Sequence, residues 1–227
     1  MTNTLRIKQG KTELTVDHRG EDLTFMHPSY GPGTYTNVKE LIEKDNLEPP
    51  TMAQTASLVH TAFNSDDEYS KEIKEIMKSK WLWAFTGTLY IPNKGAYIEE
   101  NPQVKNGMPY MDQGELERKL EANDPGVRFV PFGFKTGTMS PINLSKNAYV
   151  IALAGEEGAE KLAEVSDEYG INPHLYSFTL VNEPLTRVSA LLSGWFLDHR
   201  LYVNGDNHGG WGSRAVGVRV AKIKEEK

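Results

Sequence analysis

Side chains that could bind a metal or a ligand gather near the C-terminus. The stretch LYVNGDNHGGWGSRAVGVRV, residues 201–220, holds carboxylate, imidazole and amide groups between two runs that alternate like β-strands. Acids and histidines of this region are residue types that hold zinc and, through it, a water activated for hydrolysis. They are Asp198, His199, Asp206 and His208. No HxH or HExxH spacing orders them, so a metal-assisted hydrolase is one of two hypotheses.

Other catalytic or cofactor-binding motifs are incomplete. The segment NGDNHGG offers oxygens from Asn204, Asp206 and Asn207 in the manner of a calcium loop, but it lacks the later bidentate glutamate. FGFKTGT lacks the glycine and lysine spacing of a phosphate-binding loop, and no G-x-S-x-G elbow surrounds Ser189 or Ser193. The absence of cysteine excludes thiolate nucleophiles and cysteine-ligated metals. We therefore assign no catalytic residue, metal ligand or cofactor.

The composition is that of a soluble globular protein. Of the 227 residues, 38% are hydrophobic and 25% are charged, which provides enough apolar material for a core. The 25 basic residues are scattered among 31 acidic ones, and the net charge of -6 argues against a nucleic-acid partner. Neither a signal peptide nor a membrane-spanning run is present. We expect one domain, residues 1–227, cytoplasmic by default, with display on a cell or virus surface left open.

Capping signals predict helices in the first half of the chain. Asn37 is followed three residues later by Glu40, the spacing of a capping box, which predicts a helix over NVKELIEKDNL. Thr51 and Gln54 repeat this spacing before MAQTASLVHTAF, where apolar residues recur at helical intervals. Further helices are predicted over 69–80, over 112–123 with Asp112 as the cap, and over 155–170, where a glycine ends the helix.

Aromatic and β-branched runs predict strands. WLWAFTGTLYIP is a predicted buried strand, with Trp81, Trp83 and Phe85 in the core. LRI and ELTV near the N-terminus are predicted short strands, and HPSYGPG is a predicted loop. Near the C-terminus, strands over 201–203 and 215–220 are expected to enclose a polar loop.

The end of the chain resembles a known fold. The order WFLDHRLYV, NGDNHGGWGSR and AVGVRV is similar to the final part of a C-type lectin fold of the formylglycine-generating type, and Gly217 to Val220 stand where its last strand commonly reads GFRV. The whole chain is similar to the variable proteins of diversity-generating retroelements, in particular the archaeal type. The resemblance implies an α+β fold with amphipathic helices packed on short antiparallel sheets. It also implies a non-catalytic ligand-binding region over 190–220, rewritten by an adenine-directed reverse transcriptase.

Residue types in this region agree with adenine-directed mutation. Changes at the adenines of an AAC codon give Asn, Asp, Gly, Ser, His, Tyr, Phe, Leu or Val, which crowd residues 194–213. Tryptophan cannot be reached, so Trp195 and Trp211 are fixed framework positions or come from a different template codon. Because they stand among polar loop residues, surface recognition and structural anchoring are both open for them. A lectin-like domain with fixed carbohydrate specificity is an alternative to binding of an unknown protein or surface ligand. The predicted ligand-binding residues are Gly194, Trp195, Phe196, Asp198, His199, Asn204, Asp206, Asn207, His208, Gly210, Trp211 and Ser213.

Overall fold

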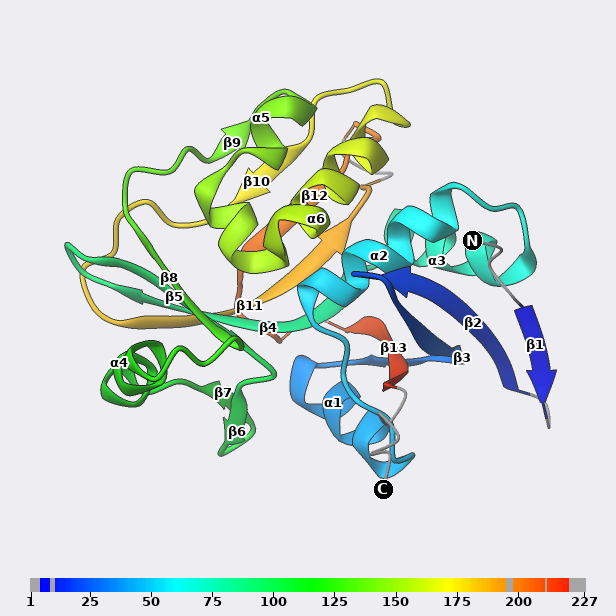
Figure 1. The fold of residues 1–227 in the computed structure, drawn as a ribbon, viewed down its shortest axis with the longest axis horizontal. Coiled ribbons are helices and arrows are strands. Elements are labelled where there is room, and N and C mark those ends of the chain that lie inside the picture. Colours follow the sequence, from blue (N-terminus) through cyan, green and yellow to red (C-terminus); the bar gives the residue numbers. More distant parts are fainter. Residues whose placement is uncertain (1–4, 9–10, 195–197, 211, 221–227) are drawn as a thin grey trace.

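A mixed β-sheet organises the fold (Figure 1). The computed structural model describes residues 5–8, 11–194, 198–210 and 212–220. The strands are β1 Leu5–Lys8, β2 Lys11–His18, β3 Glu21–Gly33, β4 Leu82–Ile91, β5 Gly95–Glu100, β6 Gln103–Lys105, β7 Met108–Tyr110, β8 Val127–Pro131, β9 Gly137–Thr138, β10 His174–Tyr176, β11 Leu185–Leu192, β12 Tyr202–Asn207 and β13 Ser213–Val220. Within the described residues, 11 strands form one sheet in the order β1-β2-β3-β13-β4-β11-β12-β10-β9, with β5 paired to β4 and β8 paired to β5. β6 and β7 form a separate hairpin.

The strand nearest the C-terminus lies inside this sheet. β13 pairs antiparallel with β3 and joins β4 in parallel through Arg214 and Leu82. On the other side of β4, β11 pairs antiparallel with β4 and with β12. β12 then pairs in parallel with β10. The expectation of short antiparallel sheets is therefore correct for most pairs, and the β10–β12 and β13–β4 pairs are parallel.

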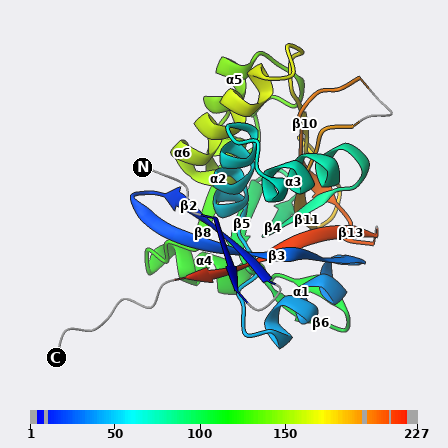
Figure 2. The ribbon, with the colours of Figure 1, turned by 90° about the vertical axis from the view of Figure 1, so that its right-hand side faces the viewer.

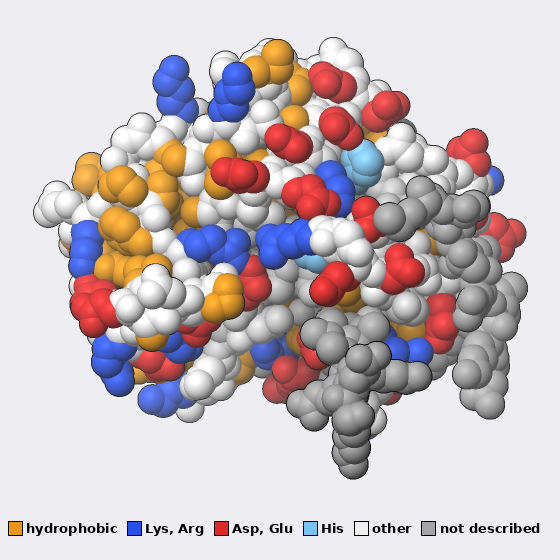
Figure 3. Space-filling view, in the orientation of Figure 1, with side chains coloured by type: hydrophobic (Ala, Val, Ile, Leu, Met, Phe, Trp, Pro, Cys, Tyr) orange, Lys and Arg blue, Asp and Glu red, His pale blue; other side chains and the backbone are white. Residues whose placement is uncertain are grey.

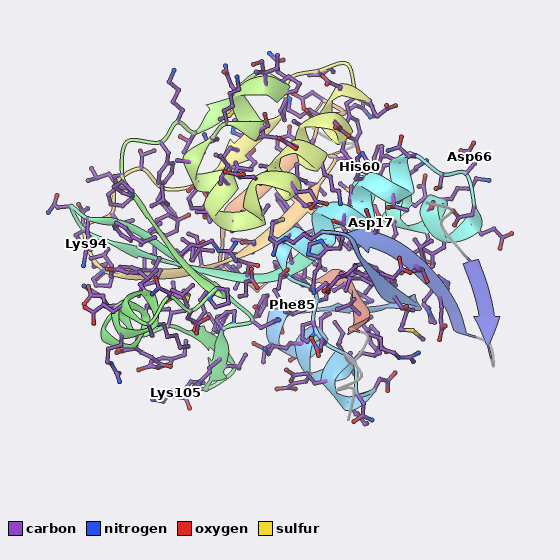
Figure 4. The ribbon with its side chains drawn as sticks, in the orientation of Figure 1. Asp17, His60, Asp66, Phe85, Lys94 and Lys105 are labelled. Carbon is purple, nitrogen blue, oxygen red and sulfur yellow. The ribbon has the colours of Figure 1, made fainter. Side chains whose placement is uncertain are left out.

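Helices pack on both faces of the central strands. The helices are α1 Tyr35–Lys44, α2 Met52–Phe63, α3 Glu68–Ser79, α4 Gln113–Glu121, α5 Pro141–Ser145 and α6 Ala148–Asp167. α2 and α6 pack together and cover the face of β4 that carries Leu82 and Ala84. α1 packs on the opposite face, where Trp83 and Phe85 are fully buried (Figure 4). This alternation follows from the two-residue period of a strand and confirms that both aromatic side chains belong to the core.

The capping signals predict two helices correctly. At α2, the backbone N–H of Gln54 donates to Thr51 Oγ1 at 3.3 Å and the backbone N–H of Thr51 donates to Gln54 Oε1 at 2.9 Å, which completes a capping box. Asp112 caps α4 by accepting a hydrogen bond from the backbone N–H of Glu115 at 2.9 Å. None of the described helices combines the length and apolarity needed to cross a membrane.

Other element boundaries differ from the sequence prediction. HPSYGPG belongs to β3 because this long strand pairs with β2 and β13, and bulges in the β13 pairing absorb its irregular residues. α1 begins earlier than predicted, because Thr34 rather than Asn37 is its cap. α6 begins at Ala148, and Gly155 breaks it with φ 75° and ψ 167°. The predicted start at residue 155 is therefore a break inside the helix.

Candidate ligand-binding face

The polar stretch near the C-terminus is strand for half of its length. β12 continues through Asn207, whereas the sequence predicted a loop after Val203. β10 pairs with it in parallel, with His174 opposite Tyr202 and Tyr176 opposite Asn204. The alternating residues of the two strands, including Val203, point into the core beneath α6. Figure 2 shows α5 and α6 on one side of β10.

Three aromatic rings cluster on the side of β10 and β12 that faces away from α6. The rings of Tyr176 and Tyr202 are stacked, with centroids 5.6 Å apart and an interplanar angle of 14°. The His174 ring lies 4.4 Å from Tyr176 and 5.9 Å from Tyr202, tilted against both. His174 and Tyr176 are partly exposed, whereas Tyr202 is 4% exposed. The rings of His174 and Tyr176 are therefore accessible to solvent, and the buried ring of Tyr202 packs against both of them.

Hydrogen bonds and an ion pair join this ring cluster to the loop before β12. Tyr202 Oη donates to Asp198 Oδ1 at 2.7 Å, and Asp198 forms an ion pair with Arg200. Arg200 Nη1 donates to Thr138 Oγ1 at 2.9 Å, and that hydroxyl lies 3.0 Å from His174 Nδ1. Side chains from β9, β10, β12 and the loop therefore form one connected polar and aromatic surface. We call Thr138, His174, Tyr176, Asp198, Arg200 and Tyr202 the β10–β12 face.

The charges of this face are set by its hydrogen bonds and by burial. Hydrogen bonds from Arg200 and Tyr202 hold the pKa of Asp198 below its usual range, so this carboxylate is ionised at neutral pH. Burial, followed by the positive charge of Arg200, lowers the pKa of His174. His174 is therefore neutral at pH 7, and the face carries a compensated Asp–Arg pair beside neutral rings. Such a surface can bind through hydrogen bonds and aromatic contact.

A solved structure shares this architecture. It is described as "Accommodation of massive sequence variation in Nanoarchaeota by the C-type lectin fold", and it aligns with 89% of this chain and 100% of its own chain, with a TM-score of 0.58 and 19% sequence identity. This chain has a C-type lectin fold. No protein-family model matches the sequence, and no curated protein resembles it significantly. The C-type lectin fold expected from the last strand is therefore confirmed by three-dimensional similarity.

Within this C-type lectin fold, four of the predicted ligand-binding residues are buried, Gly194 and three residues with polar side chains. Asn204, Asn207 and Ser213 are 6%, 5% and 1% exposed. The side-chain oxygen of Asn204 accepts a hydrogen bond from the backbone N–H of Asp206 at 3.0 Å, and that of Asn207 accepts one from the backbone N–H of Gly209 at 2.9 Å. Both asparagines therefore stabilise turns of their own backbone, which corrects the expectation that their side chains face a ligand.

The exposed part of the predicted site lies in the loops at the two ends of β12. His199, His208 and Gly210 are exposed, and the side chain of Asp198 is 36% exposed. Gly194 is buried and has a left-handed φ of 40°, so it shapes the loop rather than offering a side chain. The predicted positions 195, 196 and 211 lie outside the described residues.

Asp206 has a different environment from Asp198. It is partly buried, and burial raises its pKa, with a hydrogen bond from Asn204 and the charge of Arg187 acting in the opposite direction. Burial raises the pKa values of the Tyr90 and Tyr149 hydroxyls, and the charge of Asp206 adds to this effect, so Asp206 lies towards the core. Across the part of the chain that the structure describes, no three His, Asp or Glu side chains are placed to hold a metal ion.

A buried hydroxyl cluster beneath β12 was not foreseen from the sequence. Tyr149 Oη lies 2.8 Å from Tyr90 Oη and 2.9 Å from Thr88 Oγ1. Tyr90 Oη donates to the carbonyl oxygen of Gly205 at 2.9 Å and also lies 2.9 Å from Ser177 Oγ. The cluster therefore holds β12 through a backbone carbonyl, a contact that does not depend on any β12 side chain. No local sequence signal indicates it, because its members are up to 117 positions apart.

A cavity at the ends of α2 and α6 is a weaker candidate for a ligand site. Its lining includes His60, labelled in Figure 4, whose Nε2 lies 2.7 Å from Glu164 Oε2. Its rim also includes Asp167 and Glu168. Acidic side chains gather on this part of the surface (Figure 3), and the imidazole is already engaged. The β10–β12 face is therefore the stronger candidate site.

Proposed function

We propose that this protein is a non-catalytic ligand-binding protein whose C-terminal surface residues are varied to change the target that it recognises. The observation that supports this proposal is that buried side chains and exposed side chains are separated along β12 and its flanking loops. Leu201 and Val203 are fully buried in the core, whereas His199, His208 and Gly210 are exposed. Replacement of the exposed side chains removes no core contact, so it costs little stability.

We further propose that the varied segment is 190–220, within one domain, and that adenine-directed reverse transcription supplies the variation. The structural counterpart is described as a C-type lectin fold that accommodates massive sequence variation. Anchoring of β12 by its backbone carbonyl at Gly205 suits this role, because the strand keeps its position when neighbouring side chains change. The target would be a protein or another surface ligand, bound by hydrogen bonds and aromatic contact.

DNA sequencing around the gene tests the proposed source of variation. We expect a near-identical copy of the codons for 190–220 that differs only at adenines, next to a reverse transcriptase gene. Differences should fall on the codons of exposed residues such as Asp198, His199 and His208, and should spare the codons of Val203 and Gly205. Absence of such a copy would contradict the proposal and would leave a lectin-like protein with one fixed partner.

A further inference from the structure

Three side chains of the β10–β12 face lie outside the segment proposed to vary, namely Thr138 of β9 and two rings of β10. His174 and Tyr176 belong to β10, whereas the proposed variable segment is 190–220. Their rings contact Tyr202 at centroid distances of 5.9 and 5.6 Å, so they are part of the same surface. The face therefore has one half from β9 and β10 and another half from β12 and its loops.

Core packing does not account for the two rings. Leu175, between them in the sequence, is 1% exposed and belongs to the core beneath α6. His174 and Tyr176 point the other way, as the strand period requires, and both are partly exposed. A tyrosine and a histidine at the surface of a sheet supply contact area at a low cost in conformational entropy.

The position of these rings relative to β12 is fixed by the backbone. The parallel pairing sets His174 opposite Tyr202 and Tyr176 opposite Asn204. Leu175 and Val203 are paired in the same register and are both buried. A one-residue slip of β10 would move Leu175 out of the core, so changes at exposed positions leave the two rings in place.

We propose that His174 and Tyr176 form a constant strip of the binding face, which contacts every protein target that the varied residues select. This inference rests on the proposed function. The varied loops would set specificity, and the constant strip would contribute a common part of the affinity. The target class is a folded protein surface, because tyrosine and arginine, both present on this face, are enriched at the hot spots of protein interfaces.

Selection of binders from a library of the full chain tests the proposal. The library would be displayed on yeast and selected separately on two unrelated probe proteins, egg-white lysozyme and streptavidin. Tyr176→Ala and His174→Ala would then be introduced into each selected clone and the Kd measured. The randomised positions are Asp198, His199, His208, Gly210 and Gly212.

The expected result is a common loss of affinity. Tyr176→Ala should weaken binding by about tenfold or more in clones selected on either probe, because loss of a central aromatic contact costs more than about 1 kcal/mol. Tyr176→Phe should stay within about twofold. The matched control is Tyr110→Ala, at a tyrosine on the separate β6–β7 hairpin that is 39% exposed. This control should leave each Kd unchanged.

The outcomes separate this inference from the proposed function. Binders that keep their affinity after Tyr176→Ala and His174→Ala would overturn the constant strip while supporting the display function. Failure to select any binder would overturn the display function, and the strip with it. Thermal unfolding of each variant checks folding, and Tyr176→Leu replaces the alanine variant if that one unfolds, with the same loss of affinity expected.

Discussion

The hydroxyl of Tyr149 lies 3.3 Å from the carbonyl oxygen of Gly205 and fills the space that a side chain at residue 205 would need. A β-carbon added there would lie 2.0 Å from that hydroxyl. Tyr149 is fully buried and bonded to Tyr90 and Thr88, so it has no room to retreat. Gly205 is therefore a fixed position inside the segment proposed to vary.

Gly205→Ala should destabilise the fold strongly. The new methyl group must displace Tyr149 and break the hydroxyl cluster, and overpacking of this kind costs about 1–3 kcal/mol or more. The control is Gly212→Ala, where a β-carbon would meet no atom within 4 Å. Urea unfolding of both variants checks the prediction. Equal midpoints for the two variants would show that the cluster does not constrain residue 205.

Tyr90→Phe should also lower the free energy of unfolding. It removes the hydroxyl that donates to the carbonyl oxygen of Gly205 at 2.9 Å, while the longer hydrogen bond from Tyr149 Oη at 3.3 Å remains. Loss of one such hydrogen bond costs about 0.5–1.5 kcal/mol. The hydrogen bond from Tyr90 holds β12 from the core side. Its loss should therefore also increase the rate of amide hydrogen exchange at Val203 and Asn204. Unchanged exchange in β12 would argue that its anchoring lies elsewhere.

Neighbouring polar residues of the C-terminal segment should differ in how much a substitution lowers the free energy of unfolding. Asn207→Ala removes the acceptor for the backbone N–H of Gly209 and should cost about 1–2 kcal/mol. His199→Asn should stay within about 0.5 kcal/mol, because His199 is exposed and asparagine tolerates its left-handed φ of 55°. Chemical denaturation of the two variants measures both values. A destabilising His199→Asn would contradict a tolerant surface at this loop.

Stability should fall as the pH drops below the usual histidine range. Burial, and then the charges of Arg19 and Lys161, lower the pKa of His18 below its ordinary value of 6.5, and Glu157 and Asp17 only partly oppose them. The unfolded chain therefore takes up a proton that the folded state resists. Stability is complete above pH 6.5 and declines from there towards the lowered folded-state pKa.

The variant His18→Gln should make this pH dependence shallower. Glutamine does not titrate, and its amide can still bond with Ser57, which lies 2.9 Å from His18 Nδ1. Unfolding free energies measured at intervals from pH 7.5 to pH 5 give the slope. Part of the slope should remain, because the pKa of His174 is lowered too. If the slope is unchanged in His18→Gln, groups other than His18 cause the pH dependence of the free energy of unfolding.

Metal removal should leave the protein unchanged. In the part of the chain that the structure describes, Asp198 is engaged with Arg200 and Tyr202, and no three acidic or histidine side chains converge. We expect the melting temperature to be the same with and without EDTA, and metal analysis to find less than one equivalent of zinc or calcium. A stoichiometric ion would instead favour the metal-assisted hydrolase.

Local elements of this fold were predictable because their signals are short-range. The capping box of Thr51 and Gln54 spans four residues, and the aromatic run around Trp83 identifies a buried strand by composition alone. The site required long-range information. His174 and Tyr176 join the face through pairing with β12, and nothing near them in the sequence indicates that partner. Burial of Asn204 likewise depends on strands that the C-terminal segment meets only in the folded chain.

The place of β13 between β3 and β4 has a consequence for the synthesis of the protein. The facing edges of these two strands stay open until the ribosome has made the residues of β13, so the sheet closes after the C-terminal segment has been translated. A mutation that introduces a stop codon within 190–212 would leave both edges unpaired and prone to aggregate. Quality control of the cell would then remove such truncated chains, because the central sheet is complete only in chains that include β13.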